Sequence, residues 1–592
     1  MHKSILYSGL AAAGLVFAAP VTAADNFEGE PIVVTASRSE QADAGLARSS
    51  VISREQIEHS QAPDLLELLR LEAGLDVARG GGPGSQTSVF MRGSNSNHML
   101  VLIDGVRAAA AGTGAFTWES MDPDIVERIE IVRGPQAARW GSDAIGGVIQ
   151  IFTRTPDGAH MRGAWGRYRD RSVSAAVGSA PFSLGASVRK VEGFSAQNER
   201  GFSYDPDNDG FENASLTMGG EYSLAAGELS WSMRGNDGQV EFDQGVSDIQ
   251  SWSAVTTYKH NPGENWRWQA SAGLLRDRLD TETPFGESST QTRRTQASVQ
   301  AERGIGAYSL WLLGMDSWHE SGYSSDNWSG DRYNIGAWTG LEGSNQAFDW
   351  EASLRGDKDE HFGSAVTGNL AAGWRPADDW RLFARLGKAF RAPDFNQLYA
   401  QGFGGLYAGN PDLDPEKSRS GEIGADWHFT TGQTLGLSLY ETHISDLIDF
   451  TGPDMQAINV ERARIHGAEL TYSHTTQHWH TQAALTWQDP ENRDTGEQLL
   501  RRAKNKASAA LDYKFSDGAW AGIELSHTGR RPDAGGIDLS SITLVNLRAG
   551  KPLGDGFRIE GRLENATDRN YEPLYGFNAA RRSLFVALSW QH

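Results

Sequence analysis

The feature that most constrains this chain is a two-residue alternation of apolar and polar side chains, which recurs beyond Pro156. In the run 266–274, large apolar residues and alanine occupy the even positions, while polar residues and glycine occupy the odd ones. The runs 435–439, 511–515 and 584–590 repeat this pattern. Because successive side chains of a strand point to opposite faces, the period predicts β-strands.

The strands are predicted to close into a membrane barrel. A spanning strand needs about 10 residues, and a sheet in lipid must close so that no edge stays unpaired. The roughly 436 residues after Pro156 accommodate 22 strands with turns and some long loops. We therefore predict an all-β membrane protein with an antiparallel transmembrane β-barrel. A soluble propeller or sandwich is the alternative, but it does not explain the aromatic-rich faces.

The first 23 residues have the features of a cleaved secretory signal. His2 and Lys3 precede an apolar run from Ile5 to Val16, and small residues stand before Ala24. The apolar run is shorter than the roughly 20 residues that a spanning helix needs. We expect an exported protein without a transmembrane helix.

Composition narrows the functional classes. The chain has no cysteine, so disulfides and thiol nucleophiles are excluded. The net charge of -22 argues against nucleic-acid binding. The 15 histidines are scattered, and neither an HExxH nor a GxSxG motif is present. We expect no catalytic residues and no enzyme activity; an outer-membrane hydrolase is the weaker alternative.

Residues 89–153 read as a small domain ahead of the barrel. The segments Val89–Gly93, Met99–Arg107 and Val126–Arg154 alternate short apolar runs with glycine-containing turns. Upstream, Ser53 begins a predicted capping box, and leucines at helical spacing follow until Gly74.

In this order, the three segments resemble the plug domain of TonB-dependent outer-membrane transporters. The resemblance implies a mixed α/β plug at 45–155 inside a 22-stranded barrel at 156–592, preceded by an extension at 24–44. It also implies a monomer in the outer membrane of a Gram-negative bacterium, in contact with lipid and lipopolysaccharide.

The run Pro31–Ala36 resembles a Ton box. An extended segment offers free backbone groups to the edge of a partner's sheet, and TonB, energised by ExbB and ExbD, is the implied partner. An ordinary first plug strand is the alternative. The residues expected to bind TonB are Ile32, Val33, Val34, Thr35 and Ala36.

The segment Asp205–Gly210 carries carboxylates at alternate positions, like the first half of a calcium-binding EF-hand loop. The second half does not match an EF-hand loop, because Leu216 occupies the position where a bidentate glutamate is needed. Ca²⁺ prefers six to eight oxygen ligands, so further ligands must come from elsewhere, with Asp243 and Asp248 as candidates. A solvated acidic loop is an equally weighted alternative.

A narrower resemblance points to the cobalamin transporters of the same family. It depends on Ser445–Asp449, Ala463–Gly467 and Leu499–Lys504. It implies import of a corrinoid such as cobalamin, with structural Ca²⁺ in the extracellular loops. The implied calcium ligands are Asp205, Asp207, Asp209, Asp243 and Asp248, and the implied corrinoid-binding residues are Gln86, Ser88, Asn95, Thr113, Gly114 and Arg501.

Two features depart from that narrower pattern. Ser195 stands where the family's first calcium aspartate is expected, and the loop after Arg531 is short and lacks a tyrosine-rich stretch. The alternatives are a receptor for a ferric siderophore or haem, and a passive porin, which lacks a plug and a Ton box.

Overall fold

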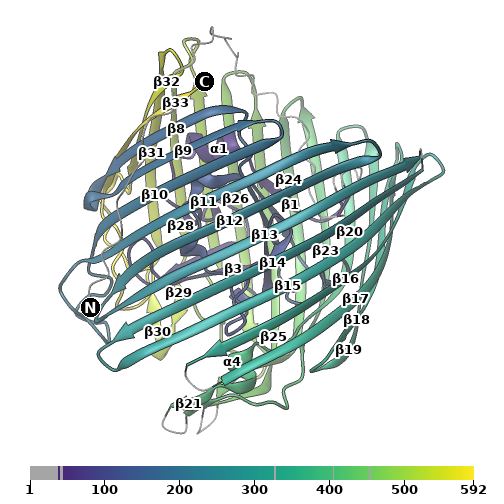
Figure 1. Ribbon diagram of the computed structural model, residues 1–592, viewed down its shortest axis with the longest axis horizontal. Coiled ribbons are helices and arrows are strands. Elements are labelled where there is room, and N and C mark those ends of the chain that lie inside the picture. The colour runs from purple at the N-terminus through teal and green to yellow at the C-terminus, as the bar shows by residue number, and fades with distance from the viewer. Residues whose placement is uncertain (1–37, 40–44, 264, 326–327, 404–405, 452–454) are drawn as a thin grey trace.

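The structure is a computed structural model that describes residues 38–39, 45–263, 265–325, 328–403, 406–451 and 455–592. A closed barrel surrounds a smaller domain, as predicted (Figure 1). The expected signal segment 1–23 and the predicted Ton box 31–36 lie outside the described residues, so both stay predictions. Within the described residues, no helix is long and apolar enough to cross a membrane.

The barrel has 22 antiparallel strands in the described part of the chain, and each pairs with the next along the sequence. The last strand closes the wall by pairing with the first, with Val586 opposite Trp165. The strands are β8 (Gly158–Gly166), β9 (Arg171–Ser179), β10 (Phe182–Phe194), β11 (Asp209–Leu224), β12 (Gly227–Phe242), β13 (Gly245–Gly263), β14 (Trp266–Thr283), β15 (Gly286–Ile305), β16 (Ser309–Ser324), β17 (Trp328–Ser344), β18 (Phe348–Asp359), β19 (Gly363–Ala377), β20 (Trp380–Arg391), β23 (Glu416–Thr430), β24 (Gln433–Thr451), β25 (Gln456–Thr475), β26 (Trp479–Asn492), β27 (Asn505–Lys514), β28 (Trp520–Thr528), β31 (Ile542–Gly554), β32 (Phe557–Glu564) and β33 (Ser583–Gln591).

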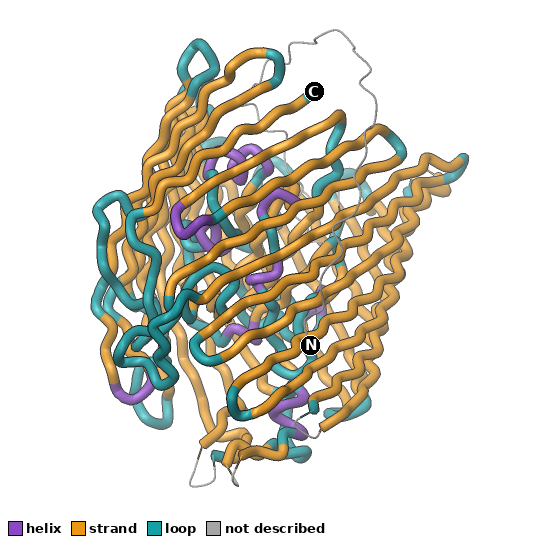
Figure 2. The backbone as a smooth tube through the Cα atoms, turned by 60° about the vertical axis from the view of Figure 1, so that its left-hand side comes forward, coloured by secondary structure: helices purple, strands orange, loops and turns teal. Residues whose placement is uncertain are grey.

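The two-residue period sorts the side chains of each strand between lipid and lumen. On β14, Trp268 and Leu274 are exposed on the outer face, as the alternation predicts. One end of the barrel carries tight turns, and the other carries long connections such as 195–208 and 565–582 (Figure 2). Short periplasmic turns and longer extracellular loops are typical of these barrels, so the long connections mark the extracellular end.

Short strands and helices connect the long strands at the extracellular end. The connection after β20 contains α4 (Phe395–Tyr399), β21 (Gln401–Phe403) and β22 (Leu406–Ala408), and the connection after β28 contains β29 (Arg531–Asp533) and β30 (Ile537–Leu539). Two short 3-10 turns, Arg167–Arg169 and Ala534–Gly536, complete this end.

The domain inside the barrel is built on a five-stranded mixed sheet in the order β1-β6-β7-β4-β5, in which β4 and β7 are parallel. A separate hairpin pairs β2 with β3. The strands are β1 (Ser49–Ile52), β2 (Leu75–Arg79), β3 (Thr87–Met91), β4 (Met99–Ile103), β5 (Val106–Arg107), β6 (Val126–Arg133) and β7 (Gly147–Thr153); the helices are α1 (Arg54–Ser60), α2 (Leu65–Leu69) and α3 (Ala137–Trp140), with 3-10 turns at Ser96–His98, Trp118–Ser120 and Pro123–Ile125.

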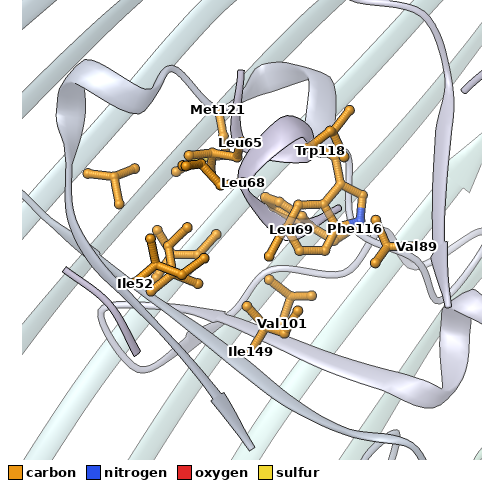
Figure 3. Close-up of a cluster of buried hydrophobic side chains, with 14 of the residues drawn as sticks. Ile52, Leu65, Leu68, Leu69, Val89, Val101, Phe116, Trp118, Met121 and Ile149 are labelled. Atoms are coloured by element: carbon orange, nitrogen blue, oxygen red, sulfur yellow. The ribbon is translucent and has the colours of Figure 1, made fainter. Parts of the chain in front are cut away.

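The predicted capping box begins α1: the Ser53 side chain accepts from the backbone of Gln56, whose side chain accepts in return. The chain between Ser53 and Gly74 forms two short helices instead of one, since Pro63 cannot continue the first. Leucines of α2 pack on strand residues such as Val101 and Ile149 to form the plug core (Figure 3). This core holds the turns between the plug strands against the barrel wall.

Candidate transport site

Arg92 of the Val89–Gly93 motif anchors the plug to the wall. Its Nη2 lies 2.9 Å from Oε1 of Glu422 on β23 and 2.8 Å from Oε2 of Glu469 on β25, and all three side chains are buried. The Tyr440 ring packs 4.3 Å from the guanidinium. Burial alone lowers the pKa of Arg92, but the two carboxylates raise it well above its ordinary value. The cation is therefore permanently charged and paired.

Further buried ion pairs fix neighbouring turns of the plug. Arg139 on α3 lies 2.9 Å from Glu342 on β17. His98 lies 3.0 Å from Glu416 on β23, and the same carboxylate lies 2.8 Å from Arg391 at the end of β20. The Arg139–Glu342 and His98–Glu416 contacts join the plug to the wall. Breaking the Arg139–Glu342 pair leaves an uncompensated buried charge, so that pair resists separation of the plug from the wall.

Arg38 ties the start of the chain to the wall, two residues beyond the predicted Ton box. Its Nη1 and Nη2 each lie 3.0 Å from an oxygen of Asp316 on β16. The guanidinium stands between the rings of Trp140 and Trp338, 4.6 and 5.0 Å from their centroids. Ser39 donates to Glu302 at 3.0 Å.

A cavity of about 1270 Å³ with a mixed polar and apolar lining lies beside Arg38, between the plug and the wall from β10 to β16. Around it, hydrogen bonds with at least one neutral partner hold the plug. Ser232 on β12 donates to Asp104 at 2.8 Å, and Gln296 on β15 donates to the Gly105 carbonyl oxygen at 2.8 Å. The plug is therefore held by buried ion pairs on the side of β23 and β25, and by hydrogen bonds with at least one neutral partner on the side of β12 and β15.

A recess of about 850 Å³ opens among the extracellular connections after β10, β28 and β32. Its lining combines aromatic and basic side chains with acids and amides. Arg200 lies 2.5 Å from Glu572 and 5.4 Å from the Tyr575 ring centroid. Beneath it, Phe577 packs on Ala78 and Phe90 of the plug. The recess therefore rests directly on the plug; its aromatic and basic lining residues include Tyr204, Tyr571, Tyr575, Arg200 and Arg569.

The acidic loops meet beside this recess. Asp243 accepts from the backbone N–H groups of Gln197 at 2.7 Å and Asp205 at 2.9 Å. Asp209 accepts from the Ala196 N–H at 2.5 Å. Partial burial, with the neighbouring Asp205 carboxylate, raises the pKa of Asp207. Four of the five predicted calcium ligands thus come from two loops that hydrogen bonds join.

Asp248 does not join them. It lies exposed on β13 between the buried Ser247 and Ile249, and accepts from Gln239 at 2.8 Å. Ser195, in place of a family aspartate, donates to the Asp205 carbonyl oxygen at 2.9 Å. In the part of the chain that the structure describes, no three metal-ligating side chains are grouped to hold an ion.

The comparison with known families decides the class. A profile described as "TonB dependent receptor-like, beta-barrel" matches residues 150–566, and the "TonB-dependent Receptor Plug Domain" matches residues 43–148. The chain belongs to the TonB-dependent receptor family. Its inner domain is the plug, its location is the Gram-negative outer membrane, and its activity is TonB-dependent transport across that membrane. TonB-dependent receptors are transporters, not enzymes.

Solved structures with the same fold include three iron-related receptors. A variant of the ferric enterobactin receptor PfeA from Pseudomonas aeruginosa has a TM-score of 0.79 and 16% identity, covering 95% of this receptor and 100% of that chain. The FrpB iron transporter of Neisseria meningitidis has a TM-score of 0.79 and 15% identity, with 93% and 99% covered. The siderophore receptor PirA of Acinetobacter baumannii has a TM-score of 0.78 and 15% identity, with 95% and 100% covered.

These similarities establish the fold of this TonB-dependent receptor. None of the three neighbours is named as a cobalamin transporter, so the narrower resemblance has no support from them. The passive porin alternative is wrong, because a plug lies inside the barrel.

The predicted ligand residues are spread over the extracellular side of the plug and one loop. Gln86 and Thr113 are exposed, whereas Ser88, Asn95 and Gly114 are half-buried. Asn95 accepts a hydrogen bond from Arg502. Arg502 directly follows Arg501, which is the sixth predicted ligand residue. None of the six predicted ligand residues is among the described residues that line the recess.

Arg501 nevertheless reaches the edge of the recess. Its Nε donates to Asp533 at 2.9 Å, and the other oxygen of Asp533 accepts from the Tyr575 N–H at 2.8 Å. Sequence reasoning missed the 569–578 loop that lines the recess. The cluster Arg569, Asn570 and Tyr571 was an available signal, because aromatic and amide side chains gather at ligand sites.

Proposed function

We propose that this receptor imports a ferric siderophore, which it first binds in the recess between the 195–208, 529–541 and 565–582 connections. The recess carries the proposal, because its volume of about 850 Å³ suits a ligand of that size and its lining suits the chemistry. Guanidinium groups donate charge-assisted hydrogen bonds to anionic oxygen atoms of a ferric chelate, and tyrosine rings supply rigid apolar contact. The named ligands of the structural neighbours support the same class.

A corrinoid is the second candidate, favoured by the acidic loops. Asp205, Asp207, Asp209 and Asp243 bring four carboxyl groups to one pair of loops beside the recess, where Ca²⁺ would neutralise their repulsion. In that proposal Ca²⁺ orders the loops before the corrinoid binds, so the affinities for the two are coupled.

One titration series separates the candidates. The purified receptor is titrated with ferric enterobactin, haem and cyanocobalamin, each in EGTA and in millimolar Ca²⁺. The siderophore proposal expects the ferric chelate to bind tightest and Arg200→Ala to weaken it by about 1.5 to 3 kcal/mol, as for a hydrogen bond to a charged group. Cyanocobalamin binding that strengthens with Ca²⁺ and is lost in Asp207→Ala would reverse the order of the two candidates.

Coupling to TonB is proposed for residues 32–36, the predicted Ton box. Val33→Pro removes one N–H donor and fixes φ, so strand pairing with TonB should fail. Ligand binding should remain at the wild-type level, because the substitution changes no residue of the recess, while energised uptake should stop. Normal uptake by this variant would assign coupling to another segment.

A further inference from the structure

Glu119 faces the barrel wall from a short 3-10 turn of the plug, Trp118–Ser120. Trp118 within this turn and Met121 directly after it are buried in the plug core (Figure 3). Arg234 on β12 donates to the last carbonyl oxygen of the turn at 3.0 Å. Because its neighbours are fixed on both sides, the Glu119 side chain is held between the plug and the wall.

The Glu119 side chain lines a cavity of about 20 Å³, which has room for one water molecule. The plug supplies Arg79 and Asp122 to the lining, and the wall supplies side chains of β10 and β11. Oε2 of Glu119 is buried and has no hydrogen-bond partner among the described residues. A charged carboxylate oxygen without such a partner is costly to bury. The position therefore favours the protonated carboxyl group.

The two arginines among the described residues that line this cavity are already paired. Nη2 of Arg79 lies 2.7 Å from Oδ2 of Asp64, which lines the same cavity. Nη2 of Arg189 on β10 lies 2.6 Å from Oδ2 of Asp170. Each guanidinium is thus compensated by another carboxylate. Glu119 therefore meets cations whose charge is already balanced.

The surroundings of Glu119 act on its pKa in both directions. Burial raises the pKa most, and the negative charge of Asp277 on β14 raises it further. The backbone N–H of Glu119 itself and the paired Arg79 lower the pKa, and the result is a value of about 8. The neighbouring Asp122 differs, because it accepts from the Asp124 N–H at 2.9 Å. At neutral pH the Glu119 carboxyl group carries its proton.

We propose that Glu119 links docking of the plug to proton binding. The docked plug holds this carboxyl group in its protonated form. Separation of the Trp118–Ser120 turn from the wall admits water, and the O–H bond breaks with release of the proton to that water. The docked state therefore binds one proton more than the separated state, so a rise in pH favours separation. This linkage does not depend on which ligand is imported.

The pH range of the effect follows from the pKa of Glu119 in the two states. Below about pH 4.5, the ordinary pKa of the group, both states are protonated and docking is strongest. Between about pH 4.5 and pH 8 only the docked state keeps the proton, so the equilibrium constant for separation rises by up to about tenfold per pH unit. Above about pH 8 both states are ionised, and Glu119 adds no further pH dependence.

Infrared spectroscopy of the purified full-length receptor tests the protonated state. At neutral pH the wild type should show the C=O band of protonated carboxyl groups, and this band should be weaker in Glu119→Gln. The amide keeps the shape of the protonated acid, so the variant should fold. In the wild type, part of the band should disappear as the pH rises through about 8, a titration that needs no variant. An identical band in both proteins would mean that Glu119 is ionised in the docked plug, and the proposal would be wrong.

Urea-induced release of the plug tests the linkage. Because the chain has no cysteine, a single spin label at the exposed position Gln86→Cys reports the fraction of plug released. The release constant of the wild type, divided by that of Glu119→Gln, should rise about tenfold or more between about pH 6 and pH 8. The matched control Asp157→Asn removes an exposed carboxylate and should titrate like the wild type.

Two outcomes of the urea experiment would overturn the proposal. A ratio that stays constant with pH would show that Glu119 has the same protonation in the docked and the released plug. An equal change in the Asp157→Asn control would assign the pH dependence to the overall charge of the receptor and not to Glu119.

Discussion

The two sides of the plug meet the same barrel through different chemistry. Toward β23 and β25, Arg92 enters the wall as a buried cation between two buried carboxylates. Toward β12 and β15, Asp104 and Gly105 meet the neutral side chains of Ser232 and Gln296 beside a large cavity. Loss of a buried ion partner costs about 3 to 5 kcal/mol, whereas a hydrogen bond contributes about 0.5 to 1.5 kcal/mol between neutral groups and about 1.5 to 3 kcal/mol to a charged group. The contrast teaches that the plug separates from the cavity side at a lower free-energy cost.

The largest effect is expected from Arg92→Met. This change leaves Glu422 and Glu469 buried together without a cation and should destabilise plug docking by about 3 to 5 kcal/mol. Thermal unfolding in detergent and proteolysis of the plug measure it. The control is the triple variant Arg92→Met, Glu422→Gln and Glu469→Gln, which removes all three charges and should recover most of the loss. If Arg92→Met alone were as stable as wild type, the ion pairs of Arg92 would not hold the plug more strongly than the hydrogen bonds on the cavity side.

An intermediate effect is expected from Arg38→Ala. The substitution removes the paired contact to Asp316, worth about 1.5 to 3 kcal/mol for hydrogen bonds between charged groups. Because the chain has no cysteine, a single spin label at Val33→Cys reports the mobility of the preceding segment. The label should become more mobile in Arg38→Ala, and equally so in Asp316→Asn. An additive response of the double variant would show that the two residues do not act through each other.

The smallest effect is expected from Ser232→Ala. It removes one hydrogen bond to Asp104 beside the cavity, but the carboxylate keeps its two hydrogen bonds from Thr153, so the apparent stability should fall by only about 0.5 to 1.5 kcal/mol. Hydrogen exchange of the 104–107 turn measures the local change. Exchange in the Arg92 turn should stay at the wild-type level. Loss of protection in both turns would mean that the plug responds as one unit and that the two sides are not independent.

Periodicity in the sequence was enough to predict the strands and their outward faces. Trp268 and Leu274 lie on the outer face because a two-residue repeat permits only two orientations. The same repeat predicts the orientation of Asp248, since the inward Ser247 and Ile249 on either side direct it outward. Its role as a calcium ligand stays a prediction.

Contacts between distant parts of the chain were beyond sequence reasoning. The motif around Arg92 predicted a plug turn, but Glu422 lies 330 residues further along and nothing local in the sequence pairs the two. The recess combines the 195–208 connection with two connections that lie hundreds of residues further along, so its composition exists only after the barrel closes. Local sequence patterns specify the strands and helices, whereas closure of the barrel brings together the residues of the recess.

The unequal strand lengths give the barrel a high side and a low side. β15 has 20 residues, and the nine-residue β8 lies where the barrel closes. At about 3.4 Å per residue and a tilt of about 40°, these correspond to about 50 Å and about 23 Å of height. The connections that form the recess follow β10, β28 and β32, close to the low side. A diffusing ligand therefore meets a protein wall from one direction and a lower rim from the other. The association rate should consequently depend on access across the low side, even where the affinity does not.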